Sequence, residues 1–338
     1  MKPYLVNVPV RVNIWIRPEC QRRQFQVLKE ARPSIIFLQS DGGRNEKEWE
    51  AIKQNRKLFD EGIDWECTVY RLYEDHNNGL YSMGNKVQEL IWNTVDRCIF
   101  LEDDYIPSVS YFRFCEVLLE KYKDDERIEC ICGMNHEGIT EGVDSDYFFS
   151  REGSIWGIAT WKRVFGSINP NFEYSSDAYT MKLLKQRTKH NTFMWKQILG
   201  YVNDAMYGGH IAGAEFIVSF DMYGQNRLQI IPTKNMICNI GYGADATHAT
   251  EFRKLAKGIR RIFNMETYEY EFPLKDAKYI IPDIAYEKRR NRIMAQGHPM
   301  ILFWRRVETF FLCSKYDGLS AIIKKIKYKI SNRKILER

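Results

Sequence analysis

Three consecutive acidic residues follow an apolar run in the stretch RCIFLEDDYIP, residues 97–107. Neighbouring carboxylates repel one another and lose hydration beside a buried strand, so packing alone gives no reason to place them there. Carboxylate oxygens are the ligands that Mg²⁺ and Mn²⁺ prefer. Because side chains alternate along a strand, we expect Glu102 and Asp104 to point to the same side. The stretch therefore predicts a divalent cation site that bridges the phosphates of a nucleotide.

The start of a helix offers a structural explanation for the same acids. The stretch SVSYFRFCEVLL, residues 108–119, has a helical pattern, and an acid near a helix N-terminus interacts favourably with the helix dipole. That effect explains one acid, whereas three precede this helix and Pro107 intervenes. We therefore favour the metal site.

Short apolar runs alternate with helical stretches through the first half of the chain, which indicates an α/β fold with a mostly parallel sheet flanked by helices. The strands are expected at residues 8–16, 34–40, 65–73, 97–104 and 128–134. In such sheets ligands bind beyond the carboxyl ends of the strands. The polar residues at those ends are Arg17, Asp41, Gly42, Asp75, Asn77, Asn78 and the acids 102–104. The sequence thus predicts one site along one edge of the sheet.

The sequence lacks the phosphate-binding motifs of two classes of nucleotide-binding enzyme. The first strand is followed by RPECQRR, which contains neither G-x-G-x-x-G nor the Walker lysine motif. A dinucleotide dehydrogenase and a P-loop enzyme are therefore disfavoured. A sugar-nucleotide nucleotidyltransferase stays open as an alternative, although it needs a glycine-rich basic loop at this point.

Composition indicates a globular protein, since 44% of the residues are hydrophobic and 28% are charged. No apolar run approaches the roughly 20 residues of a spanning helix, and the first residues do not resemble an export signal. The eight cysteines are scattered, which favours small buried residues in a reducing compartment over a disulfide framework. We expect a cytoplasmic protein, with Cys130 and Cys132 as core residues.

Four stretches of the chain together resemble a known family. They are VPVRVNIWIRPECQRRQFQVLKEARPSIIFLQSDGGR, IFLEDDYIPSVSYFRFCEVLLEKYKDDERI, YFFSREGSIWGIATWKR and IIPTKNMICNIGYGADATHAT, which cover roughly residues 7–250 in matching order. On these stretches the chain resembles GT-A-fold glycosyltransferases, specifically bacterial nucleotide-diphospho-sugar transferases related to the Golgi N-acetylglucosaminyltransferases. The resemblance implies a GT-A (Rossmann-like) domain over residues 1–250. Its nucleotide-sugar-binding half would be 1–145 and its acceptor and catalytic half 146–250.

The resemblance also assigns roles to residues along the predicted edge. The acidic metal motif of the family falls on Glu102, Asp103 and Asp104, and His248 in DATHAT would complete the metal shell or contact the diphosphate. The nucleotide would lie against Arg17, Pro18, Asp41, Gly42 and Asn77, with Asp41 and Gly42 at its base or ribose. The implied cofactors are Mn²⁺ or Mg²⁺ and a nucleotide-diphospho-sugar, expected to be UDP-linked. The run LYSMGNK, residues 80–86, departs from a shorter glycine-rich run of the family.

Direct displacement of the sugar needs a carboxylate that accepts the proton of the acceptor hydroxyl. Relatives carry a Trp-Asp pair upstream of the strand that contains IIP, residues 230–232. Counting back, the acid falls on Glu215, without the tryptophan. An exposed helical acid is an equal explanation for Glu215, and Asp204 and Asp221 are nearby rivals.

The aromatic stretch SIWGIATW, residues 154–161, is placed beneath the acceptor by the resemblance. Flat indole rings stack on sugars but also dominate core packing. We expect mixed roles, with Trp156 and Gly157 nearer the acceptor than Trp161.

The end of the chain, residues 251–338, is expected to form a basic, partly amphipathic helical extension. Its last part mixes apolar clusters with lysines in IIKKIKYKISNRK, a combination found in helices that lie on anionic membranes. A solvated helix packed on the body is the alternative. No aromatic-basic platform accompanies the lysines, so no nucleic acid is expected as a partner.

Taken together, these features predict a metal-dependent, inverting glycosyltransferase of the hexosyl- or N-acetylhexosaminyltransferase class. Its acceptor would be a glycan or lipid-linked saccharide in cell-surface polysaccharide synthesis, and it would contact the inner face of the membrane peripherally. A catalytically inactive, membrane-surface carbohydrate-binding protein is a second alternative, which the uncertain base supports.

Overall fold

An eight-stranded sheet forms the centre of the protein in the computed structural model, which describes residues 1–167, 173–189, 194–196, 198–199, 221–241 and 252–318. In spatial order its strands are β3 (Thr68–Tyr73), β2 (Pro33–Ser40), β1 (Val6–Ile14), β4 (Arg97–Leu101), β8 (Ile158–Trp161), β6 (Ile128–Cys132), β9 (Leu228–Pro232) and β7 (Tyr147–Ser150). A separate two-stranded sheet pairs β5 (Tyr105–Pro107) with β10 (Ile237–Asn239).

Most pairings in the large sheet are parallel, as expected from the alternation of strands and helices. β1 runs parallel to β2 and β4, β2 to β3, and β6 to β9. β8 is antiparallel to both β4 and β6, and β7 is antiparallel to β9. Because β8 is antiparallel to both of its neighbours, β4 and β6 run in the same direction. The carboxyl ends of β1 to β4, β6 and β9 therefore meet at one edge, and the α/β prediction is confirmed.

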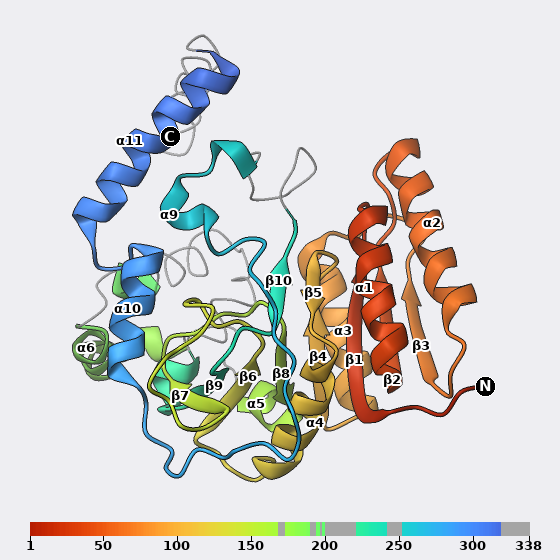
Figure 1. The fold of residues 1–338 in the computed structure, drawn as a ribbon, viewed down its shortest axis with the longest axis horizontal. Helices are drawn as coiled ribbons and strands as arrows, with labels where there is room; N and C mark the ends of the chain where they lie inside the picture. The colour runs from red at the N-terminus through yellow and green to blue at the C-terminus, as the bar shows by residue number, and fades with distance from the viewer. Residues whose placement is uncertain (168–172, 190–193, 197, 200–220, 242–251, 319–338) are drawn as a thin grey trace.

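Helices flank the sheet on both faces (Figure 1). The described helices are α1 (Pro18–Ala31), α2 (Glu46–Gly62), α3 (Leu80–Thr94), α4 (Ser110–Lys121), α5 (Lys162–Ser167), α6 (Ala178–Arg187), α9 (Lys257–Arg260), α10 (Ile284–Met294) and α11 (Pro299–Asp317), with 3-10 turns at Glu173–Ser176 and Phe252–Lys254. Of these, α9 and α11 lie away from the sheet (Figure 1). The sheet faces α1, α2 and α4 through one apolar core and α3 and α10 through another, while α5 contributes Val164 to the first core and Phe165 to the second.

The alternation of side chains along the strands explains this division into two cores. In β2, Ile36 and Leu38 enter the first core, whereas Phe37 between them enters the second. Cys130 and Cys132 are fully buried together in the second core, which confirms their prediction as core residues. Runs that are apolar at every position are typical of strands covered on both faces.

The segment after residue 251 contacts the body between α9 and α10. Glu269 accepts hydrogen bonds from the backbone N–H groups of Val109 and Ser110 at the start of α4. Further along, Arg151 pairs with Glu287 of α10, and the Tyr286 ring lies against Phe148 of β7. α10 thus packs on the sheet, and the expected helical C-terminal extension is present.

The last described helix, α11, contacts the body through three polar side chains. Arg305 donates to the carbonyl of Ile293, Glu308 accepts from the backbone of Lys257, and Asp317 pairs with Lys254. The side chains that it exposes include the large apolar residues Met300, Phe303, Trp304, Phe310 and Phe311 together with the basic residues Arg306 and Lys315. Among the described residues no helix is long and apolar enough to cross a membrane.

Candidate functional site

The acidic run begins where β4 ends, at the carboxyl edge of the sheet. Glu102 accepts hydrogen bonds from Arg11 Nη2 and Asn13 Nδ2 of the neighbouring strand β1, each at 2.8 Å. Burial alone would raise the pKa of Glu102, but Arg11 and then Asn13 stabilise its charged form and leave the pKa below its ordinary value. Glu102 is therefore an ionised side chain held by β1.

The two following carboxylates converge on one guanidinium. Arg17 Nη1 lies 2.7 Å from Asp104 Oδ2 and 3.5 Å from Asp103 Oδ1. The alternation expected for Glu102 and Asp104 does not hold, because β4 ends at Leu101 and the acids lie in the turn beyond it. Asp103 and Asp104, not Glu102 and Asp104, thus form the acidic pair.

This pair carries more negative charge than its neighbours neutralise. Asp103 is 5% exposed, and its Oδ2 atom is buried and has no hydrogen-bond partner within the part of the chain that the structure describes. Burial raises the pKa of Asp103 to about 7, with Arg17 opposing this shift and the charges of Asp104 and Glu102 adding to it. Burial also raises the pKa of Asp104, again opposed by Arg17. A bound cation would stabilise the ionised form of both groups.

A buried glutamine of α1 holds the acidic turn in place. Gln24 Nε2 donates to the carbonyl oxygens of Glu102, at 2.7 Å, and Tyr105, at 2.8 Å. Gln21 is also buried and donates to Gln24. Neither residue was among those predicted from the sequence. They could have been found from their spacing, because two glutamines three residues apart lie on the apolar face of the first helix. A buried glutamine amide without a hydrogen-bond partner would be unfavourable there.

The strand β10 brings a second chain segment against the acids. The backbone N–H of Ile240 donates to the carbonyl oxygen of Asp104 at 3.0 Å. A Cβ atom added to Gly241 would lie 1.7 Å from Asp104 Oδ2, so only glycine fits this position. Sequence reasoning missed Gly241. His248 follows it in the chain and lies outside the described residues.

Asp41, at the end of β2, organises the turn that follows β3. Its carboxylate accepts hydrogen bonds from the backbone of Gly42, Asn78 and Gly79, each at 2.9 Å, and from Asn77 Nδ2 at 3.1 Å. A Cβ atom on Gly42 would come within 2.4 Å of the His76 backbone, which explains the glycine. A nucleotide that binds at the ends of β2 and β3 would contact the turn that the Asp41 carboxylate holds in place.

We expect Asp41→Ala to destabilise the protein by about 2–3 kcal/mol, because several backbone donors lose a charged acceptor at once. Asp75→Ala removes an exposed acid from the same turn and should change stability by less than about 0.5 kcal/mol. Urea unfolding followed by circular dichroism measures both. Equal effects of the two substitutions would contradict the role assigned to Asp41.

Trp156 lies near the acidic turn. Its half-buried ring is 6.2 Å from the ring of Tyr105, the residue after Asp104, and 5.2 Å from that of Phe263. Gly157 has a φ of 59° and its carbonyl accepts from the Tyr111 hydroxyl at 2.9 Å. Trp161, by contrast, is a buried core residue. The aromatic segment therefore approaches the acids through Trp156.

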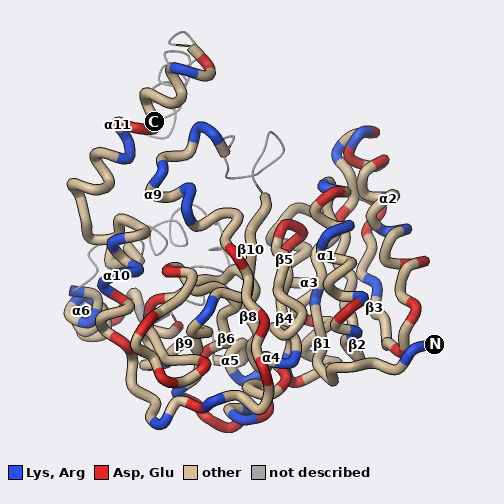
Figure 2. The backbone as a smooth tube through the Cα atoms, in the orientation of Figure 1, with Lys and Arg blue, Asp and Glu red and all other residues tan. Residues whose placement is uncertain are grey.

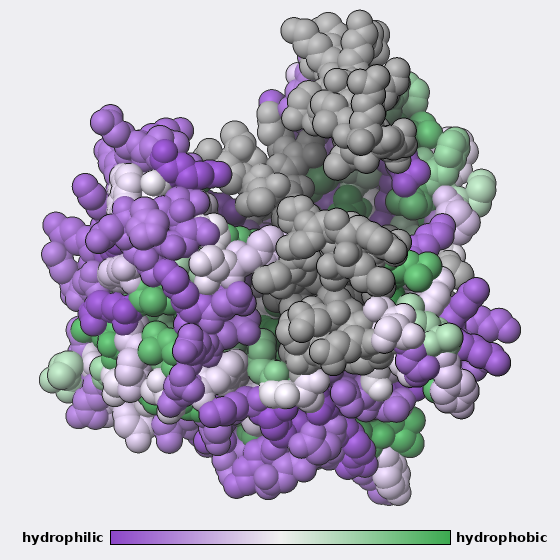
Figure 3. Space-filling model, turned by 180° about the vertical axis from the view of Figure 1, so that it is seen from behind, coloured by the Kyte–Doolittle hydropathy of each residue, from purple (hydrophilic) through white to green (hydrophobic). Residues whose placement is uncertain are grey.

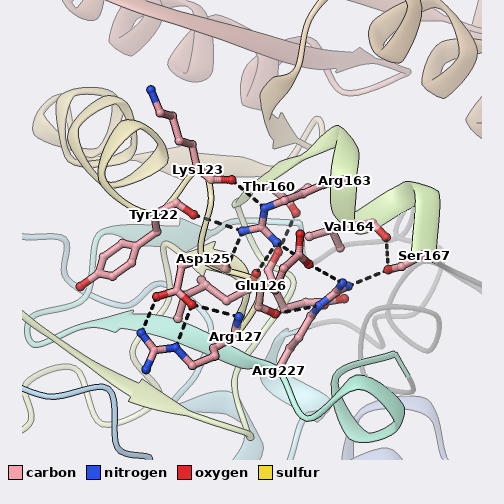
Figure 4. Close-up of polar contacts among 12 residues, drawn as sticks. Tyr122, Lys123, Asp125, Glu126, Arg127, Thr160, Arg163, Val164, Ser167 and Arg227 are labelled. Carbon is pink, nitrogen blue, oxygen red and sulfur yellow. Dashed lines mark hydrogen bonds and ion pairs between the residues drawn. The ribbon is translucent and has the colours of Figure 1, made fainter.

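The base candidates divide by location. Glu215 and Asp204 lie outside the described residues, whereas Asp221 is described and is 2% exposed. Asp221 pairs with Arg227 Nη1 at 2.9 Å, and the same nitrogen lies 3.3 Å from Glu129. Figure 4 shows Arg227 reaching toward Ser167 and Glu126 in this cluster. Since Glu129 and Arg227 are at the starts of β6 and β9, the cluster is at the edge opposite to the acidic turn.

This cluster makes stability depend on pH. Burial, and then the charge of Asp221, raises the pKa of Glu129 from 4.5 to about 8, although Arg227 opposes the shift. A carboxyl whose pKa is raised on folding stabilises the folded state at low pH, and this contribution is lost as the pH rises through the folded-state pKa. We expect this contribution to lower the melting temperature as the pH rises from about 4.5, the ordinary pKa, to about 8, the folded-state pKa, and Glu129→Gln to flatten that fall. An unchanged slope in Glu129→Gln would contradict this assignment.

No protein-family model matches the chain, and no curated protein sequence matches it significantly. Among solved structures, it is similar to the mannosyltransferase PcManGT from Pyrobaculum calidifontis in complex with GDP-Man and Mn²⁺, with a TM-score of 0.34, 9% identity and coverage of 65% of this chain and 70% of that one. It is also similar to a UDP-glucose pyrophosphorylase complexed with UDP-glucose, with a TM-score of 0.35, 8% identity and coverage of 69% of this chain and 92% of that one. For mouse xyloside xylosyltransferase 1 the TM-score is 0.32, the identity 11% and the coverage 71% of this chain and 86% of that one. Likeness at this level carries no argument about the reaction.

Proposed function

We propose that this protein is a metal-dependent, inverting glycosyltransferase that transfers a sugar from a nucleotide-diphospho-sugar to a glycan or lipid-linked saccharide in cell-surface polysaccharide synthesis. The observation that carries the proposal is the buried acidic pair Asp103 and Asp104 at the carboxyl edge of the sheet, opposite a single arginine. Ligands of parallel α/β sheets bind at this edge. Within the proposed family the chain would be related to the N-acetylglucosaminyltransferases named above.

The residues of the acidic turn fit a hard divalent cation. The described residues contain no group of three or more His, Cys, Asp or Glu side chains that could hold a metal alone. Mg²⁺ and similar ions are commonly held by one or two carboxylates together with substrate phosphates, and the unpartnered Asp103 Oδ2 is available as such a ligand. A bound Mn²⁺ or Mg²⁺ would neutralise charge on the departing diphosphate.

The residues around the acids would orient the donor. Arg17 precedes α1, whose first residue is Pro18, so both the guanidinium and the amino end of a 14-residue helix would face phosphate oxygens. The turn of Asp41, Gly42 and Asn77 would border the base or ribose. A UDP-linked donor is proposed from the resemblance alone.

The acceptor would enter from the side of Trp156 and Gly157, whose segment contacts the acidic turn through Tyr105. Glu215 is proposed as the group that takes the proton from the acceptor hydroxyl, and His248 as a further contact to the metal or diphosphate. The opposite-edge location of Asp221 supports Glu215 and Asp204 over Asp221 as the base.

Donor binding tests this proposal directly. Titration calorimetry with UDP-, GDP- and CMP-linked sugars, each with and without Mn²⁺, should give binding of at least one donor that depends on the cation. Cation-independent binding of every donor would contradict the metal-dependent function. The same panel tests whether the uridine nucleotide is preferred.

A peripheral contact of α11 with the inner face of the cell membrane is also proposed. The exposed apolar side chains Met300, Phe303, Trp304 and Phe311 follow helical spacing along α11. Figure 3 shows apolar residues along this side of the molecule, and Figure 2 shows basic residues along the neighbouring α9 and α10. Aromatic side chains beside basic ones are the combination that binds anionic lipid surfaces.

We expect the triple substitution Phe303→Ser, Trp304→Ser and Phe311→Ser to reduce sedimentation with phosphatidylserine vesicles at least tenfold, roughly the effect of 1.4 kcal/mol. The matched control Leu5→Ser, Leu80→Ser and Ile281→Ser alters equally exposed apolar residues elsewhere and should bind as the unaltered protein does. Binding should also weaken as salt rises, because surface charge is screened within about 8 Å at physiological ionic strength. Equal vesicle binding by both triple variants would exclude α11 as the contact.

A further inference from the structure

We propose that Arg17 is an exchangeable counter-ion: it neutralises Asp103 and Asp104 while the site holds no donor, and it moves to a phosphate of the donor when a divalent cation takes its place. This inference rests on the proposed function and adds a sequence of events to it. Binding of the cation and binding of the diphosphate would then be coupled through one side chain.

Charge balance is the first argument. The acids 102–104 face two arginines, and Glu102 is neutralised separately by Arg11. One guanidinium is left for the two carboxylates of Asp103 and Asp104. With both carboxylates ionised, the pair carries one excess negative charge, in a place where Asp103 Oδ2 is buried and has no hydrogen-bond partner among the described residues. A divalent cation would neutralise both carboxylates and release Arg17 from them.

The hydrogen-bonding geometry of Arg17 is the second argument. Among the described residues only its Nη1 atom is engaged by the acids, and its Nε atom is buried without a partner. A guanidinium forms its strongest contacts when two N–H groups bind two oxygens of one carboxylate or phosphate. Arg17 uses a fraction of that capacity, so a phosphate beside it would be a better partner than the acids are.

The position of Arg17 is the third argument. It lies at the N-cap of α1 with no side-chain capping hydrogen bond, so the helix does not depend on this side chain. The amino end of α1 favours an anion, as helix N-termini do. A phosphate drawn to this helix end would lie beside Arg17, the residue at the N-cap.

Arg17→Met provides the test, because it removes the charge and keeps an unbranched side chain. In the absence of nucleotide, binding of Mn²⁺ alone, measured from the electron paramagnetic resonance of the free ion, should become about 10- to 100-fold tighter, since the competing cation is gone. In the presence of saturating Mn²⁺, calorimetry should show binding of UDP weakened by a similar factor. The two affinities are thus expected to change in opposite directions.

Two further variants keep the test decisive. Arg22→Met removes an exposed arginine of the same helix and should alter neither affinity. Arg17→Lys keeps the charge without the fork, so it should leave Mn²⁺ binding unchanged and weaken UDP binding; it replaces Arg17→Met if that variant fails to fold.

Each outcome has a clear meaning. Unchanged or weaker Mn²⁺ binding in Arg17→Met overturns the exchange, and so does the absence of Mn²⁺ binding in every variant. If instead Mn²⁺ binding tightens in Arg17→Met as expected but the unaltered protein binds no nucleotide, the competition between Arg17 and the cation for the acidic pair is confirmed. In that case the proposed donor, and with it the transfer of Arg17 to a phosphate, is wrong.

Discussion

Asp104→Ala is expected to abolish Mn²⁺-dependent binding of the donor, with a loss of affinity of at least about 100-fold. Asp104 has the shorter contact with Arg17, and its Oδ2 atom faces Gly241. Its removal takes away one of the two carboxylates of the pair and leaves Arg17 to Asp103. Calorimetry with and without Mn²⁺ measures the change.

The fold should survive this substitution. Alanine leaves the backbone hydrogen bond between Ile240 and residue 104 intact, and Gln24 continues to hold the turn through the carbonyl oxygens of Glu102 and Tyr105. Asp124→Ala, which removes an exposed acid, is the matched control and should bind the donor normally. Full Mn²⁺-dependent binding by Asp104→Ala would rule out its role as a metal ligand.

Glu215→Gln is expected to lower the rate of sugar transfer by roughly 10²- to 10⁴-fold, the usual contribution of a positioned proton acceptor. Glutamine keeps the size and much of the hydrogen bonding of glutamate but cannot take the proton. The donor is proposed to be held by the metal and the edge of the sheet, so its affinity should not change. A transfer assay beside calorimetry of donor binding separates the two effects.

Asp204→Asn is the matched control for the base, since Asp204 is the remaining rival once Asp221 is paired with Arg227 at the opposite edge. A slow Glu215→Gln with normal donor affinity and a normal Asp204→Asn is the expected pattern. The reverse pattern would move the base to Asp204. A joint fall in donor affinity and rate would make Glu215 a binding or structural residue.

The strands and the edge that carries the site could be predicted because they depend on local patterns. Ile36 and Leu38 on one face of β2 and Phe37 on the other follow from the two-residue period of a strand. The polar residues that end the strands mark the carboxyl edge for the same reason. Even here, the end of β4 was placed three residues too late, and Asp103 rather than Glu102 shares Arg17 with Asp104.

The contacts that shape the acidic turn could not be predicted, because they join residues far apart in the chain. Gln24 reaches Glu102 across 78 positions, and Gly241 meets Asp104 from a strand that pairs with β5. The position of Asp41 after an apolar run indicated a polar strand end. It did not indicate that the Asp41 carboxylate accepts hydrogen bonds from the turn that follows β3. The helical extension expected over residues 251–338 is present in α10 and α11, but the contacts of Glu308 and Asp317 that hold α11 to the body could not be predicted from composition.

The most direct test of the proposed reaction is the identity of its products. The protein is incubated with Mn²⁺, a labelled sugar nucleotide and a mixture of saccharide acceptors, and the nucleotide products are separated by ion exchange. The account predicts release of a nucleoside diphosphate in step with transfer of the label, and loss of both on chelation of Mn²⁺. Consumption of the sugar nucleotide only when pyrophosphate is added, with a nucleoside triphosphate as product, would contradict it and identify a nucleotidyltransferase.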